Sequence, residues 1–185
     1  MNDAERIRLA SANDVAALLG GGFQGELVDK LAASPRFAAR LHAAVQRRLG
    51  GLSALEPAAV AALALTPDSL SSIVLRAGAV WHAPAIALVV EASARRRLIA
   101  SLGSDVYFIA LEGRSLAPLE AIVPPDADDW AGAAMRHGAS CWSAWCALQR
   151  PAVASRLALL GRNGLPERVH EDFGPAIVDW LLDRP

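Results

Sequence analysis

Proline recurs along the chain at points where a helix would begin. Three such starts are Ser34-Pro35, Glu56-Pro57 and Thr66-Pro67. Proline suits the first position of a helix because its missing N–H would have no partner there, and Ser or Thr before it can cap the first turn. Apolar residues follow these starts at three- and four-residue spacing, whereas the alternation typical of strands is nearly absent. These proline starts and the helical spacing of apolar residues predict a chain built of helices.

The predicted fold class is all-α, a compact multi-helix bundle in a single domain spanning residues 1–185. We expect a small N-terminal helical subdomain over residues 1–50 and a surface connection near residues 117–129, where prolines and aspartates gather. A chain of this length buries enough surface to fold without disulfides. Its two cysteines, Cys141 and Cys146, are too few for a disulfide framework.

The central segment predicts one clear break. An apolar stripe runs from Leu70 to Trp81, and the chain is expected to break between Gly78 and Ala83 because Pro84 cannot sit inside a continuing helix. A new helix is then predicted from Pro84 to the terminating Gly103. Its expected buried face is Ile86, Val89, Val90, Ala94, Leu98 and Leu102. Near the C-terminus, a polar turn at residues 170–172 should precede a last short helix around residues 177–182.

Charge and hydropathy exclude several classes of protein. The formal net charge of −1 lacks the basic excess of a nucleic-acid-binding domain, so no nucleic acid is expected as a partner. The longest charge-free run, residues 77–90, is shorter than the roughly 20 apolar residues that cross a bilayer, and Pro84 interrupts it. No secretory signal follows the charged N-terminus. We therefore expect a cytoplasmic protein with no transmembrane segment.

The residues predict no catalytic apparatus, cofactor or metal site. His137 and Cys141 share a helical face, but a structural zinc site usually contains a tight ligand pair such as Cys-x2-Cys, and none exists. The glycines between Gly20 and Gly25 resemble a dinucleotide loop only in spacing, because no strand precedes them. A small helical enzyme using His82 or His137 stays open as a rival interpretation.

Two features suggest contacts with other proteins. Arg95, Arg96 and Arg97 form a solvated helix face that can also dock an acidic partner or lipid head groups. The tryptophans Trp130, Trp142 and Trp145 form either a core or a partner-docking patch, and three in one helical region favour a core.

The stretch Leu-Arg-Ala-Gly-Ala-Val-Trp-His-Ala-Pro-Ala-Ile at residues 75–86, followed by residues 98–103 and by Tyr-Phe-Ile-Ala-Leu at residues 107–111, resembles the central segment of the SctK family. These are the YscK-, PscK- and OrgA-like accessory proteins of bacterial type III secretion systems. The resemblance covers about 40 residues. It is a pattern of residue types without a catalytic signature.

The resemblance implies a non-enzymatic cytoplasmic adaptor of the sorting platform, peripheral to the inner membrane. Such a protein links an SctD-like ring protein at the membrane to an SctQ-like pod protein. On this hypothesis Arg95, Arg96 and Arg97 offer an electrostatic docking face. Exposed members of Trp81, Trp142 and Trp145 would offer apolar anchors. A helical regulator or effector chaperone, with a two-fold apolar dimer surface, is the other alternative.

Overall fold

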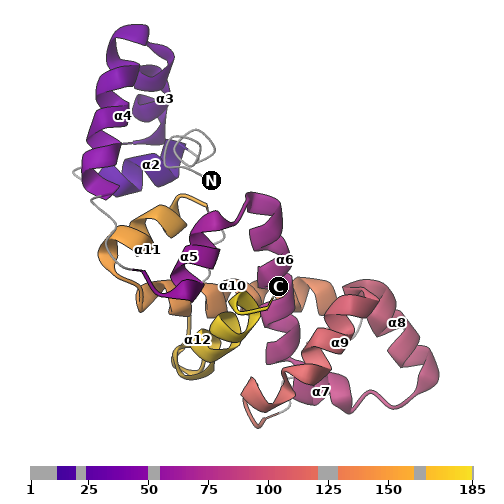
Figure 1. The fold of residues 1–185 in the computed structure, drawn as a ribbon. Helices are drawn as coiled ribbons and strands as arrows, with labels where there is room; N and C mark the ends of the chain where they lie inside the picture. Colours follow the sequence, from indigo (N-terminus) through magenta and orange to yellow (C-terminus); the bar gives the residue numbers. More distant parts are fainter. Residues whose placement is uncertain (1–11, 20–23, 50–54, 121–128, 161–165, 185) are drawn as a thin grey trace. The chain divides into compact units, whose positions relative to one another are not determined.

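The computed structural model describes residues 12–19, 24–49, 55–120, 129–160 and 166–184, which contain helices and no strand. Figure 1 shows the helices in chain order. They are α2 (Ala12–Leu19), α3 (Gly25–Ala33), α4 (Pro35–Leu49), α5 (Pro57–Ala64), α6 (Pro67–Trp81), α7 (Ala83–Ala87), α8 (Ala92–Leu102), α9 (Ser104–Glu112), the 3-10 turn η1 (Arg114–Leu116), α10 (Trp130–Ala147), α11 (Pro151–Ala158) and α12 (Arg168–Leu182). The all-α prediction is confirmed.

The chain divides into two compact units. Unit 1 comprises Met1–Pro67 and Gln149–Gly161, so it takes in the predicted subdomain 1–50 and adds α5 and α11. Its helices α2, α3 and α4 pack on one another, and α11 packs on α4 and α5. A small aliphatic core lies among α2, α3, α4 and the end of α11, consisting of Val15, Ala16, Leu19, Val28, Val45 and Leu159. The single domain over residues 1–185 stays a prediction.

Unit 2 comprises Asp68–Leu148 and Arg162–Pro185. Helices α10 and α12 pack along each other, and Trp145 Nε1 of α10 donates a hydrogen bond of 2.6 Å to Asp179 Oδ1 of α12. Of the predicted surface connection at 117–129, residues 121–128 lie outside the described residues, as do residues 20–23 of the glycine-rich stretch that begins at Gly20.

Helix α6 crosses α10 at two glycines. A Cβ on Gly78 of α6 would collide with the carbonyl oxygen of Ala134, and a Cβ on Gly138 of α10 would collide with the carbonyl oxygen of Val74. The break predicted between Gly78 and Ala83 is confirmed, but Gly78 itself stays helical. The helix continues to Trp81 and interrupts only at His82, whose φ of −87° and ψ of 3° turn the chain before Pro84.

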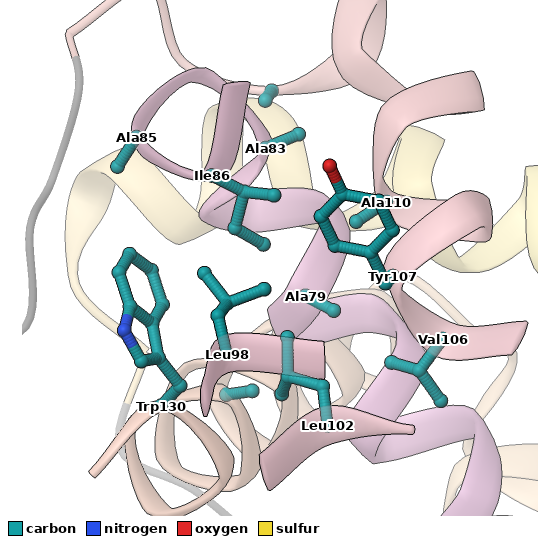
Figure 2. Close-up of a cluster of buried hydrophobic side chains, with 12 residues drawn as sticks. Ala79, Ala83, Ala85, Ile86, Leu98, Leu102, Val106, Tyr107, Ala110 and Trp130 are labelled. Carbon is teal, nitrogen blue, oxygen red and sulfur yellow. The ribbon is translucent and has the colours of Figure 1, made fainter. Parts of the chain in front are cut away.

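The single helix predicted from Pro84 to the terminating Gly103 is wrong, because residues 88–91 separate α7 from α8. Glu91 has extended backbone angles, with φ −66° and ψ 127°, and precedes α8. Val90, predicted to be buried, is 84% exposed. The interruption reorients α8 so that Leu98 points towards Ile86 of α7 in a shared core (Figure 2).

The last helix is longer than predicted. Residues 170–172, expected as a polar turn, belong to the first turns of α12, which continues through Pro175. The helix begins early because the side chain of His170, at its third position, bonds back to the backbone N–H of Glu167, the residue before the helix. Proline at position 175 lacks the N–H that would bond the Glu171 carbonyl, and Glu171 is exposed to solvent.

Candidate functional site

The arginine triplet lies on the outer side of α8. Arg95, Arg96 and Arg97 are exposed, whereas Leu98 and Leu102 of the same helix are buried. Successive residues of a helix are about 100° apart, so Arg96 points away from Leu98 while Arg95 and Arg97 flank it. The three side chains therefore form a cationic arc around the solvent side of the helix. We call these residues the arginine arc.

The buried side of α8 fixes the position of this arc. Leu98 and Leu102 pack into a cluster formed by α6, α7, α9 and the start of α10 (Figure 2). Figure 2 shows Leu98 between Ile86 and the indole of Trp130. In addition, the backbone N–H of Ala131 donates to Ser101 Oγ at 3.3 Å, which joins the end of α8 to the start of α10. A rigid support of this kind presents the arginines with little loss of backbone freedom on binding.

Two exposed apolar residues precede the arginine arc. Leu88 is 66% exposed at the end of α7, and Val90 follows in the connection to α8. Both residues lie close to Arg95 in the sequence. The helical pattern concealed them because it assigned Val90 to a buried face. The segment thus combines apolar and cationic side chains on its exposed surface.

The tryptophans are not surface anchors. Trp81, Trp142 and Trp145 are all among the most deeply buried side chains of unit 2. This corrects the hypothesis that exposed indoles hold a partner, because a buried ring offers no surface to dock on. Trp142 and Trp145 instead stack with ring centroids 5.2 Å apart and an interplanar angle of 27°. Their role is in the core.

Three histidines, by contrast, come together around Trp81. The Trp81 ring stacks on His170 with centroids 4.3 Å apart and on His137 at 5.8 Å. His82 meets the His137 ring edge-on at 4.9 Å, and its own ring is edge-on to Trp130 at 6.1 Å. Of these residues, the sequence indicates His82 and His137 as candidates for chemistry, whereas it places His170 in a predicted turn. Its partner lies 33 positions away, so no local pattern could indicate the contact.

The hydrogen bonds determine where the protons lie. The backbone N–H of Glu167 donates to His170 Nδ1 at 3.1 Å, so this nitrogen carries a lone pair. A neutral His170 then bears its hydrogen on Nε2, which lies 3.0 Å from His137 Nδ1 and donates to it. Glu167, His170 and His137 therefore form a directed chain of hydrogen bonds.

Both imidazoles favour the neutral form. Burial lowers the pKa of His137, with the nearby Arg136 charge acting in the same direction and Glu167 opposing it. Burial also lowers the pKa of His170, assisted by His137 and again opposed by Glu167. A neutral imidazole can act as a base, but both nitrogens of His170 and Nδ1 of His137 already have partners in the protein.

The other candidates for chemistry are weak. Within the described part of the chain, no group of three or more His, Cys, Asp or Glu side chains is placed to hold a metal ion. Burial raises the pKa of Cys141 and of Cys146 to about 12, so neither thiol supplies a thiolate near neutral pH. His137 and Cys141 thus share a helix without forming a reactive pair.

Comparison with family models, curated proteins and solved structures finds no match to this chain. None of the helices in the described ranges has the length and apolarity needed to cross a membrane.

Proposed function

We propose that this protein is a non-enzymatic helical adaptor of a bacterial type III secretion sorting platform, joining an SctD-like ring protein to an SctQ-like pod protein. The proposal starts from the resemblance of residues 75–111 to the SctK family. The observation that carries it further is the arginine arc, which this same segment presents on a helix whose other face is anchored in the core. Docking, rather than chemistry, is the function that such an arrangement serves.

The histidines support this choice over the enzyme alternative. A general base needs a nitrogen within reach of a substrate proton. His137 has its Nδ1 occupied by the Nε2–H of His170, and the His82 ring is buried against Trp130 and His137. Stacking and hydrogen bonding inside unit 2 therefore account for these side chains without a substrate.

The arginine arc favours an acidic partner segment that also carries apolar side chains. Arginines attract carboxylates over a distance and steer association, while their contribution falls as salt screens the charges. Leu88 and Val90 add apolar surface directly before the arc. We expect a partner helix or loop with alternating acidic and apolar residues to fit this combination.

The test is affinity isolation of the tagged full chain from its native bacterium. Wild-type protein should recover both a ring and a pod component. A triple Arg95→Glu, Arg96→Glu, Arg97→Glu variant should lose at least one of them. A matched triple reversal at the exposed Arg40, Arg47 and Arg114 should retain both, which separates the arc from total charge.

Three outcomes contradict the proposal or part of it. Wild-type protein that recovers no secretion component removes the adaptor function. Equal recovery by the two folded triple variants removes the arginine arc as the docking face. A discrete two-fold dimer of the isolated chain, with no platform component, supports the regulator or chaperone alternative.

A further inference from the structure

The N-terminal turn of α12 is held to α10 through imidazole rings. We propose that the Glu167–His170–His137 hydrogen-bond chain is an acid-sensitive latch, which holds this turn while both imidazoles are neutral and releases it when either takes up a proton. The inference is independent of the adaptor proposal. It rests on the placement of His170 at the third position of α12, facing His137 of α10.

The first joint of the latch is a helix cap. His170 Nδ1 accepts the backbone N–H of Glu167, one of the N–H groups that a helix leaves without an internal partner. A proton on Nδ1 turns this acceptor into a donor that faces another donor. The cap is then lost, and the Glu167 N–H must turn to solvent. Release of the first turn restores its hydration.

The second joint has the same property. His137 Nδ1 accepts the Nε2–H of His170 at 3.0 Å. Protonation of His137 at Nδ1 places two N–H groups head to head, and two charged imidazoles in contact would also repel each other. His137 can therefore accept a proton at Nδ1 only if its contact with His170 opens, whereas a proton on His170 Nδ1 breaks the helix cap.

The groups around His137 and His170 determine how strongly each ring resists protonation. On α10, Arg136 opposes a positive charge on His137, although its guanidinium also bonds Asp129 Oδ2 at 3.1 Å. At the start of α12, Glu167 favours protonation of both rings. Between α6 and α7, His82 lies edge-on to His137, and Trp81 of α6 covers both rings as an apolar lid. Burial is the largest influence on each ring and opposes the charge.

The direction of the pH dependence follows from linkage. Because the folded pKa values of His137 and His170 are lowered, the unfolded or opened chain binds protons first, at a pH near the ordinary value of 6.5. Stability from the latch is complete above this pH and falls as the pH decreases. Each histidine that stays neutral in the closed form makes opening up to about tenfold more favourable per pH unit below 6.5.

Nitrogen-15 NMR of the full chain tests the closed latch directly. At pH 8, His170 should be the Nε2–H tautomer, and so should His137. Both rings should titrate below pH 6.5. A His170 bearing its hydrogen on Nδ1, or a titration above pH 6.5, overturns the proposal without requiring any variant.

Amide hydrogen exchange then tests release. After correction for intrinsic rates, protection of the first-turn amides of α12 should fall about tenfold or more between pH 7.5 and pH 5.5. Protection in α8 should fall less. Equal changes in both helices would mean that acid loosens unit 2 as a whole, and constant protection would mean that no latch exists.

A His170→Gln variant separates the cap from the titration. Gln can accept the Glu167 N–H and donate towards His137, but it takes up no proton. The acid-induced loss of α12 protection should therefore shrink at least threefold. The matched His42→Gln, in α4 of unit 1, should leave α12 exchange as in the wild type. Should His170→Gln fail to fold, the tautomer and exchange measurements on wild-type protein still decide.

Discussion

The two units bury the apolar faces of their helices with different kinds of side chain. Unit 1 uses aliphatic residues such as Val28 and Val45, with no aromatic ring in its described core cluster. Unit 2 uses Trp81, Trp142 and Trp145, and it combines them with histidines that must also form hydrogen bonds. Aliphatic cores tolerate exchange of one residue for another of similar volume. Aromatic rings with polar edges specify a single arrangement more strictly.

This contrast predicts that unit 2 is the less forgiving of the two, and it offers a convenient readout. All five tryptophans of the chain, at positions 81, 130, 142, 145 and 180, lie in unit 2. Tryptophan fluorescence therefore follows the unfolding of unit 2 alone, whereas circular dichroism follows the helices of both units. The difference between the two signals separates the stability of unit 2 from that of unit 1.

The largest effect is expected at the α6–α10 crossing. Gly78→Ala or Gly138→Ala should destabilise unit 2 by about 3–5 kcal/mol, because each new Cβ meets a backbone carbonyl that cannot rotate away. In the double variant, unit 2 should not fold. Urea unfolding followed by fluorescence measures the change.

Unit 1 supplies the control for the crossing. A Cβ at Gly25 would meet the side-chain oxygen of Asn13, which can swing aside. Gly25→Ala should therefore lower the free energy of unfolding of unit 1 by less than about 1 kcal/mol, as followed by circular dichroism. A comparable loss in both units would refute the view that unit 2 is the stricter one.

The thiols give the next largest effect. Because burial raises the pKa of Cys141 and Cys146 from 9.0 to about 12, the thiolate fraction near pH 8 should be about a thousandfold below that of an exposed cysteine. Labelling by a thiol reagent should be correspondingly slow in the folded chain. It should become fast in urea at the concentration where fluorescence reports unfolding. Rapid labelling of the native protein would show that unit 2 opens far more readily than its packing implies.

Local signals in the sequence predicted several helix starts. Helices α4, α5 and α6 begin at the predicted Pro35, Pro57 and Pro67, because the effect of proline on a helix start is confined to one turn. The fold class follows from these signals together with helical periodicity.

What the sequence did not predict depends on distant neighbours. Glycine disfavours the interior of a helix, yet Gly78 stays helical because α10 approaches it closely. The interruption at residues 88–91 contains neither glycine nor proline, and it is explained by the packing of Leu98 against the α7 cluster. The role of His170 requires α10, far away in the sequence. In each case tertiary contact overrides a local preference.

A moderate effect is expected at the bond between α10 and α12. Asp179→Ala removes this acceptor of the Trp145 Nε1–H and should lower the free energy of unfolding of unit 2 by about 1–2 kcal/mol, because a partly buried hydrogen bond is lost. Asp179→Asn retains a side-chain oxygen and should recover more than half of the loss. Equal destabilisation by the two variants would assign the effect to the charge of Asp179 instead of its hydrogen bond. Fluorescence-monitored urea unfolding distinguishes the outcomes.

The smallest effects concern the surface ion pairs, where the two units should differ least. Arg184 Nη1 lies 2.7 Å from Glu112 Oε2 in unit 2, with side-chain exposures of 39% and 57%, and its guanidinium also covers the Trp180 ring at 3.8 Å. In unit 1, Lys30 Nζ lies equally close to Glu26 Oε1, but the two side chains are 71% and 76% exposed.

Arg184→Gln should therefore cost about 0.5–1 kcal/mol and Lys30→Gln about 0.3 kcal/mol in low salt, because exposed pairs are well solvated already. At 1 M NaCl the lysine effect should vanish as the charges are screened, whereas part of the arginine effect should persist through its contact with the indole. Urea unfolding at both salt concentrations, by fluorescence for Arg184 and by dichroism for Lys30, measures this. A complete loss of the arginine effect in high salt would show that the pair with Glu112 alone is responsible. The aromatic rings of unit 2 would then stabilise its core but not its surface.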